Sequence, residues 1–352
     1  MDTKKHIAFI SAMLTSVILI TALFSGCGEV RVNTKKGVYF DTFVTLTAYG
    51  REVPEECLES LIKYDTLFSK TENGSDIVRL NSAKGKTVGI SEDTVAVITL
   101  AEKYRVLSGG RFSHLSGSLT ELWDFKSDTP SIPKNSDIDR ALKSVKNGSV
   151  EIASNSARLT NGAKIDLGGI AKGYIADKIS EIYKKNNVSG IIDLGGNILT
   201  VGEKPDGSLF TVGIKNPENT DEVKLKLEFS GGAVVTSGTY ERNFTYENKL
   251  YHHLLDLSTG YPVDNGLCSV TIIAESSAAA DALSTAVFCM GETDGKELIE
   301  TLDNTEAVFV RTNGQISATS GLRVADDKVR LAGVEPRRAE TGKISGRLCF
   351  VS

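Results

Sequence analysis

Proline is scarce in this sequence: only 7 of the 352 residues are proline, against 33 glycines. Between residues 37 and 335 no stretch is rich in proline and serine or low in complexity, which excludes a stiff or disordered linker there. The length alone allows two domains or one large domain. Because nothing divides the chain, we expect one domain over residues 37–335, followed by a tail of unknown role over residues 336–352.

A large excess of charge of either sign is also lacking. The chain has 40 Lys and Arg against 45 Asp and Glu, a formal net charge of −5. There is no broad positive field to attract nucleic acid or anionic lipid, so we expect no nucleic-acid partner. Binding of an anionic substrate would therefore require a local site of positive charge or polarity, such as a metal ion, a loop of backbone N–H groups or a lysine. With 40% hydrophobic residues, the chain can bury a sizeable core, and disorder of the whole chain is excluded.

Cysteines are few and widely spaced, and no two form a Cys-x-x-Cys pair. This excludes a disulfide scaffold and shows no zinc-ligand spacing. Two of them lie in apolar runs and are expected in the core. The five are Cys27, Cys57, Cys268, Cys289 and Cys349.

One long hydrophobic run is present, at the N-terminus. Lys4 and Lys5 precede 18 residues without a charge, Ile7 to Phe24, and Ser25-Gly26-Cys27 follows. A basic start, an apolar segment and small residues before a cleavage site are typical of a secretory signal peptide. The cysteine after Ser-Gly resembles a bacterial lipobox, in which the thiol is lipidated, although an uncleaved membrane helix is the alternative.

We therefore expect a lipoprotein signal peptide over residues 1–26, lipidation of Cys27 and a tether over residues 27–36. The acyl chains would anchor the protein to the cell membrane on its extracytoplasmic side.

Helical and strand patterns alternate without a regular βαβ period, which favours an α+β fold over a doubly wound sheet. Hydrophobic spacing predicts helices over residues 54–68, 91–107, 170–186 and 277–290. Strands are predicted over residues 38–49 and 190–194, as two strands around the Asn161-Gly162 turn within residues 158–167, and as a hairpin within residues 307–318.

The first candidate site is a repeated strand end. Ile165-Asp166-Leu167-Gly168-Gly169 recurs as Ile192-Asp193-Leu194-Gly195-Gly196, and paired glycines allow a ligand to approach bare backbone. The first copy leads through Lys172 into a predicted helix, so acid, amides, lysine and helix N-terminus could form a phosphate cradle. The pattern is neither a P-loop nor a dinucleotide-binding fingerprint. The alternative is that the paired glycines only form turns after the two strands and bind no ligand.

The second candidate is the pair His252-His253, close to Asp256. Neighbouring residues of a strand point to opposite faces, so at most one of the pair faces a given site. A histidine near its ordinary pKa can act as a general base. Hydrogen-bonded structural histidines are the alternative.

The third candidate lies on the Ala-rich helix over residues 277–290. Asp281 and Thr285 are four residues apart, so the carboxylate and the hydroxyl share one face. Together with a backbone carbonyl, these oxygens suit Mg²⁺ that is held partly by substrate phosphates. The alternative is a surface Asp and a Thr that bonds back to its own helix.

Taken together, these motifs resemble the bacterial FAD:protein FMN transferases, the ApbE family of flavin-transferring lipoproteins. The resemblance covers residues 38–330 and implies an α+β fold around one flavin site. Its marks are Phe40-Asp41-Thr42-Phe43, Ser75 to Asn81, Gly109-Gly110-Arg111-Phe112 with Leu122-Trp123, Ile165 to Tyr174, Thr236-Ser237-Gly238, His253 to Asp256 with Pro262, and Ala280-Asp281 with Thr285. The sequence departs from the family at Ser113-His114-Leu115, Thr239 and Leu257.

The resemblance also implies roles for individual residues. Mg²⁺ would be bound by the backbone oxygen of Gly169 and the side chains of Asp281 and Thr285. The implied contacts with FAD come from Asp166 and Lys172, from Leu255 packing near it, from Lys70 on the flavin side and from Phe40 at the flavin-packing position of the first strand. His253 would be the base.

The implied activity is Mg²⁺-dependent transfer of FMN from FAD to a Ser or Thr hydroxyl of an acceptor protein, with release of AMP. The expected acceptor is a membrane-associated redox subunit. Two alternatives stay open: hydrolysis of FAD to FMN and AMP, and flavin binding without catalysis.

Overall fold

The computed structural model describes residues 30–127, 129–331 and 349–351. Its centre is an eight-stranded sheet in the order β1-β2-β6-β7-β10-β13-β14-β15, in which all neighbouring strands are antiparallel. The strands are β1 (Val32–Tyr39), β2 (Thr42–Tyr49), β6 (Ser189–Leu194), β7 (Asn197–Val201), β10 (Gly232–Gly238), β13 (Leu267–Ala274), β14 (Glu306–Arg311) and β15 (Ile316–Ala318).

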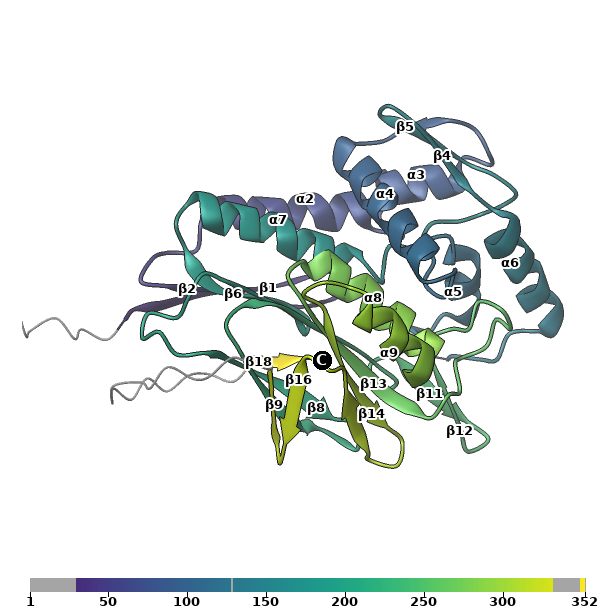
Figure 1. Ribbon diagram of the computed structural model, residues 1–352. Helices are drawn as coiled ribbons and strands as arrows, with labels where there is room; N and C mark the ends of the chain where they lie inside the picture. The colour runs from purple at the N-terminus through teal and green to yellow at the C-terminus, as the bar shows by residue number, and fades with distance from the viewer. Residues whose placement is uncertain (1–29, 128, 332–348, 352) are drawn as a thin grey trace, which may run out of the picture.

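Helices cover one face of this sheet (Figure 1). Alternate residues of β2, such as Val44 and Leu46, are buried in the largest hydrophobic cluster together with the helices. The helices are α2 (Glu55–Phe68), α3 (Asp76–Ser82), α4 (Glu92–Leu107), α5 (Gly117–Trp123), α6 (Asn135–Asn147), α7 (Ala171–Lys185), α8 (Ser277–Met290) and α9 (Glu292–Glu300).

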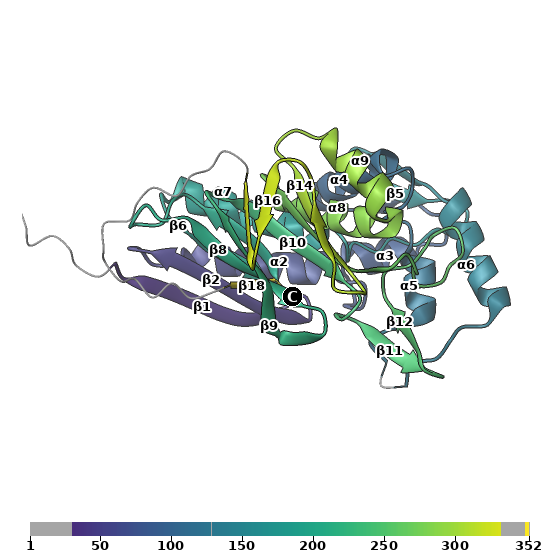
Figure 2. The ribbon, with the colours of Figure 1, turned by 60° about the horizontal axis from the view of Figure 1, so that its bottom comes forward.

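A second, five-stranded sheet packs on the opposite face (Figure 2). Ile191 and Ile198 of the large sheet share a second hydrophobic cluster with Val212 and Leu227 of the small one. Its order is β16 (Leu322–Ala325), β17 (Lys328–Leu331), β9 (Asn219–Phe229), β8 (Phe210–Asn216) and β18 (Cys349–Val351). The core is therefore two apolar layers separated by the eight-stranded sheet.

Two small sheets complete the fold. One has three strands, β3 (Val88–Gly89), β5 (Ser156–Leu159) and β4 (Val150–Ala153), and the other is the hairpin β11 (Asn243–Tyr246) and β12 (Lys249–His252). The hairpin packs aromatic rings against Trp123, with Tyr251 5.8 Å from it between ring centroids.

The predicted α+β class is confirmed, and the four predicted helices are α2, α4, α7 and α8 within two residues at each end. Residues 190–194 form most of β6, and β14 and β15 form the predicted late hairpin.

The strand predicted over residues 38–49 is confirmed over residues 42–49, which form β2, but it is not continuous, because the chain reverses at Phe40 and Asp41. Both residues have positive φ, 55° and 57°, and Tyr39 pairs directly with Thr42. Two central residues with positive φ make a type I′ turn, which usually contains Asn-Gly rather than Phe-Asp. Because residues 38–49 are rich in β-branched and aromatic residues, nothing in the sequence indicated the turn. Residues 32–36, expected in the tether, belong to β1, which pairs with β2 along its whole length.

The two strands predicted around Asn161-Gly162 are wrong. The hairpin forms earlier, between β4 and β5. The backbone of Ile165 instead exchanges hydrogen bonds with the side-chain amide of Asn81, at 2.7 and 2.9 Å. This leaves the residues after Gly162 as a loop.

The predicted signal peptide and Cys27 lie outside the described residues. Within the described residues, no helix is both long and apolar enough to cross a membrane. In the predicted tail, β18 pairs in parallel with β8.

Candidate active site

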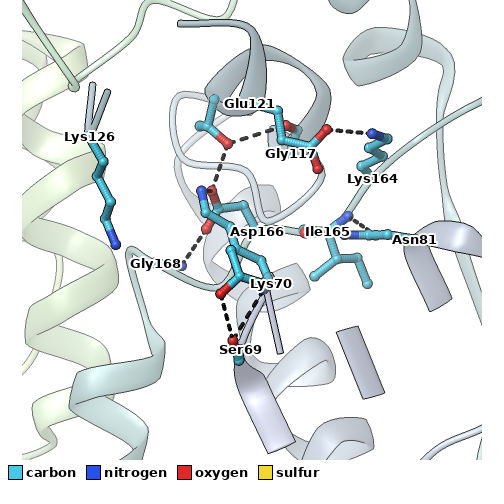
Figure 3. A network of polar contacts seen from close by, with 12 residues as sticks. Ser69, Lys70, Asn81, Gly117, Glu121, Lys126, Lys164, Ile165, Asp166 and Gly168 are labelled. Atoms are coloured by element: carbon cyan, nitrogen blue, oxygen red, sulfur yellow. Dashed lines mark hydrogen bonds and ion pairs between the residues drawn. The ribbon is translucent and has the colours of Figure 1, made fainter. Parts of the chain in front are cut away.

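The loop before α7 places Asp166 at the centre of a polar network (Figure 3). Its carboxylate accepts hydrogen bonds from Lys70 Nζ at 2.7 Å, Thr120 Oγ1 at 2.6 Å and the backbone N–H of Gly168 at 2.8 Å. Lys70 follows α2, and Thr120 lies on α5. The structure thus joins two residues that the resemblance put near the flavin, and it adds Thr120, which the sequence analysis missed.

Asp166 stays ionised at neutral pH. Burial raises its pKa, but the charge of Lys70 and the three hydrogen bonds outweigh burial and hold the pKa below its ordinary value. The result is a fixed ion pair at one side of the glycine-rich loop.

The wall behind Asp166 contains one of the departures from the family pattern. The carbonyl of His114 accepts a 2.9 Å hydrogen bond from the backbone N–H of Asp166. The His114 ring is fully buried, and burial lowers its pKa to about 4. His114 therefore supports the loop as a neutral residue.

Asp281 reaches from α8 to the first turn of α7. Its Oδ2 accepts a hydrogen bond from the backbone N–H of Gly173 at 3.0 Å. Burial raises the pKa of Asp281, and the nearby Lys172 and the Gly173 N–H only partly offset this. Among the described residues, none donates a hydrogen bond to the other oxygen, Oδ1. A buried carboxylate with one free oxygen and too little positive charge around it is a suitable cation ligand.

Gly169 lies next to Thr285. A Cβ atom on Gly169 would be 3.4 Å from Thr285 Oγ1 and 3.1 Å from the Phe112 ring. Ser237 Oγ, on β10, lies 3.3 Å from Thr285 Oγ1. Of the three residues predicted to bind a metal, Gly169 thus lies against Thr285, and Asp281 lies one helical turn before Thr285 on α8.

These groups fit Mg²⁺ better than a transition metal. They are oxygen donors, and Mg²⁺ is usually held by one or two carboxylates with water and substrate phosphates completing its octahedron. In the parts of the chain that the structure describes, no group of three His, Cys, Asp or Glu side chains is placed to hold a metal.

Lys172 lies among acidic side chains at the start of α7. Burial raises the pKa of Asp193 to about 6, against the lowering effects of the Gly196 N–H and of the Lys172 charge. The charge of Lys172 also acts on the exposed Glu241. Asp193 comes from the second Asp-Leu-Gly-Gly motif, which thus lies close to the first. Sequence analysis missed Glu241.

The two adjacent histidines have different environments, as expected for neighbours at a strand end. The buried His252 has Nε2 3.0 Å from the carbonyl of Val263, and its ring packs edge-on against Phe288. His253 donates its backbone N–H to the carbonyl of Arg242 at 3.0 Å. Burial and the charge of Arg242 lower the pKa of His253 to about 3. The His253 ring is therefore neutral at pH 7, but so low a pKa makes it a weak base. To act as a general base it would need the negative charge of a bound substrate to raise its pKa towards neutrality.

Phe40 and Leu255, both predicted to pack near the flavin, belong to separate hydrophobic clusters. Phe40 lies in the β1–β2 turn rather than in a strand, and its N–H donates to Asp65 Oδ1 at 2.8 Å. Leu255 is 6% exposed and packs in a cluster with Trp123, so most of its side chain is covered by the protein. Neither residue is joined by a hydrogen bond to the Asp166 network in the described part of the chain.

An α+β domain that gathers oxygen donors, a lysine and a histidine near a glycine-rich helix start is an arrangement typical of proteins that bind phosphate-containing ligands. The model of the ApbE family matches residues 40–309. The chain belongs to the ApbE family.

Its relatives include proteins named FAD:protein FMN transferase. One from Klebsiella pneumoniae is 30% identical over 302 residues, covering 84% of this chain and 94% of its own. Another, from Treponema pallidum, is 30% identical over 296 residues, covering 79% and 81%.

Solved structures with the same fold include the ApbE protein of Thermotoga maritima, with a TM-score of 0.76 and 32% identity over 82% of this chain and 97% of that one. The flavinyl transferase ApbE of Pseudomonas stutzeri gives a TM-score of 0.73 and 25% identity over 84% and 96%.

Proposed function

We propose that this protein is an FAD:protein FMN transferase, which moves FMN from FAD to a Ser or Thr hydroxyl of an acceptor protein and releases AMP. The observation that carries the proposal is that Gly169 lies against Thr285 while Asp281, one turn away on α8, contacts the first turn of α7. Membership of the ApbE family and the names of two relatives at 30% identity support it.

The pyrophosphate of FAD carries two negative charges, which repel an incoming oxygen nucleophile. Mg²⁺, held by the carbonyl of Gly169 and the side chains of Asp281 and Thr285, would offset that charge when bound. Lys172 adds positive charge close to the same carboxylate. The N–H groups in the first turn of α7 favour a phosphate oxygen there.

The acceptor hydroxyl is a poor nucleophile until its proton is removed. His253, neutral at pH 7, would accept that proton on a ring nitrogen. The hydroxyl oxygen then forms a bond to the FMN-side phosphorus, and the bond from this phosphorus to the bridging oxygen breaks. AMP leaves with that oxygen, and FMN stays on the acceptor as a phosphoester. The ion pair of Lys70 and Asp166 would orient the flavin part.

Mass spectrometry of a candidate acceptor after incubation with the protein, FAD and Mg²⁺ tests the proposal. Addition of the mass of FMN less one water, with one AMP released per modification, is the expected result. Free FMN and AMP without modification would show an FAD hydrolase instead. Bound FAD without any AMP would show a flavin-binding protein that does not catalyse.

We also propose that Cys27 is lipidated and anchors the protein on the extracytoplasmic side of the cell membrane. The signal-like sequence before Cys27 supports this. An anchored enzyme would meet acceptors at the same membrane, so a membrane-associated redox subunit is the proposed acceptor.

A further inference from the structure

Asp177, on the second turn of α7, holds the beginning of α8. Its carboxylate accepts hydrogen bonds from Ser276 Oγ at 2.8 Å and from the backbone N–H groups of Ser277 and Ala278 at 2.8 and 3.0 Å. The first N–H groups of a helix have no partner within the helix. Here a side chain of another helix supplies it.

The same two helices are joined a second time, in the opposite sense. Asp281 of α8 accepts the backbone N–H of Gly173 in the first turn of α7, at 3.0 Å. Each helix therefore gives a carboxylate to the N-terminus of the other. Asp177 lies four residues after Gly173, and Asp281 lies four residues after Ser277, so the two contacts are one turn apart on each helix.

Two further contacts fix the position of α8. Ser277 Oγ donates to Asn197 Oδ1, at the start of β7, at 2.6 Å, and both residues are buried. At the crossing of the helices, a Cβ on Gly173 would lie 2.3 Å from the carbonyl oxygen of Ser277. The helices thus meet with backbone against backbone, where a small displacement of α8 moves Asp281 and Thr285 with it.

We infer that Asp177 is a positioning residue for the cation site. It acts through α8 and sets the place of Asp281 and Thr285 relative to Gly169 and Lys172. The inference rests on the proposed Mg²⁺ site but not on the identity of the acceptor. Residues that orient metal ligands typically change metal affinity by about 10- to 100-fold when they are replaced.

The test compares Asp177→Asn and Asp177→Ala with a matched control, Asp76→Asn. Asp76 is a buried carboxylate on α3 that accepts the backbone N–H of Ser91 at 2.8 Å and the hydroxyl of Thr94 at 2.6 Å, at the start of α4. Asp76 thus accepts hydrogen bonds at the start of α4, as Asp177 does at the start of α8, but α4 carries no predicted metal ligand. Both substitutions at Asp177 and the control should lower the unfolding temperature.

Only the Asp177 variants should weaken metal binding. Mn²⁺ alone, measured by electron paramagnetic resonance, should bind about 10-fold more weakly to Asp177→Asn, which keeps one acceptor oxygen, and up to about 100-fold more weakly to Asp177→Ala. The Mg²⁺ concentration for half-maximal FAD turnover should rise by similar factors, with the rate at saturating Mg²⁺ largely recovered. If Asp177→Ala does not fold, Asp177→Asn alone decides.

Unchanged Mn²⁺ affinity in a folded Asp177→Asn would overturn the inference, as would an equal loss in Asp76→Asn. A failure of the proposed function looks different. In that case the wild-type protein releases no AMP, while the order of Mn²⁺ affinities among the variants still tests Asp177.

Discussion

Gly173 offers a sharp test of how α7 and α8 hold the proposed site. In Gly173→Ala, the new Cβ would lie 2.3 Å from the carbonyl oxygen of Ser277 and 2.6 Å from Cα of Ala278. Both are backbone atoms and cannot rotate away, so the helices must separate by about 1 Å to restore ordinary contacts. The 3.0 Å hydrogen bond from Gly173 to Asp281 would then be stretched or lost.

The stability cost follows from two opposing effects. Overpacking costs about 1–3 kcal/mol, and the better helix propensity of alanine returns up to about 1 kcal/mol. A net loss of about 1–2 kcal/mol lowers the unfolding temperature by about 1.5–3 °C in a domain of about 300 residues, because the entropy of unfolding grows with chain length. Turnover should suffer more, by about 100-fold, because a displacement of 1 Å at a catalytic site has effects of that order.

Calorimetry and AMP release, measured on one preparation, check both effects. Gly89→Ala is the control, because its Cβ would meet only the carbonyl of Asn155, at an ordinary 3.8 Å. If Gly173→Ala matches the wild-type protein in turnover and Mg²⁺ dependence, the helix crossing does not set the position of Asp281.

Four further predictions concern separate parts of the molecule. Asp281→Asn keeps the shape but removes the charge, so AMP release should be lost at ordinary Mg²⁺; a wild-type rate would place the metal elsewhere. His253→Ala should still bind FAD but transfer FMN about 10²- to 10⁴-fold more slowly. His252→Ala should mainly lower the unfolding temperature. Equal losses of rate in the two variants would refute His253 as the base. Burial raises the pKa of Asp76, but its hydrogen bonds outweigh burial and lower the pKa below its ordinary value. The ionised carboxylate therefore stabilises the fold fully above about pH 4, and this stabilisation is lost as the pH falls through the lowered pKa. Acid unfolding curves of Asp76→Asn should lack this loss of stability. Cys27→Ser should abolish membrane attachment or processing, which fractionation and mass spectrometry detect, and normal anchoring would contradict lipidation.

The sequence allowed the long helices and the α+β class to be predicted because their signals are local. The helix over residues 277–290, for example, is rich in alanine and contains neither glycine nor proline. The β1–β2 turn could not be predicted, because Phe40 and Asp41 adopt left-handed conformations that usually need Gly or Asn. The loop at Ile165 was missed because its partner, Asn81, lies 84 residues away.

The candidate site shows the same limit. Asp281 and Thr285 could be paired from their helical spacing, whereas Lys70 and Asp166 are 96 residues apart and were connected only through the family resemblance. The contact between Asp177 and α8 could not be inferred from the sequence, because an aspartate within an amphipathic helix is usually a residue that faces solvent. Its role depends on where another helix begins.

The chain has a single tryptophan, and this gives the protein a built-in optical probe. Trp123 is buried at the end of α5, and its Nε1–H donates to the carbonyl of Gly260 at 2.7 Å, in the loop that follows His253. All tryptophan emission therefore comes from one place, where α5 meets that loop. Flavins absorb in the range of tryptophan emission, so a bound flavin should quench this signal by energy transfer. Stopped-flow fluorescence could thus follow FAD entry and FMN departure in the unlabelled protein, and it would also show whether the loop loosens before the rest of the domain unfolds.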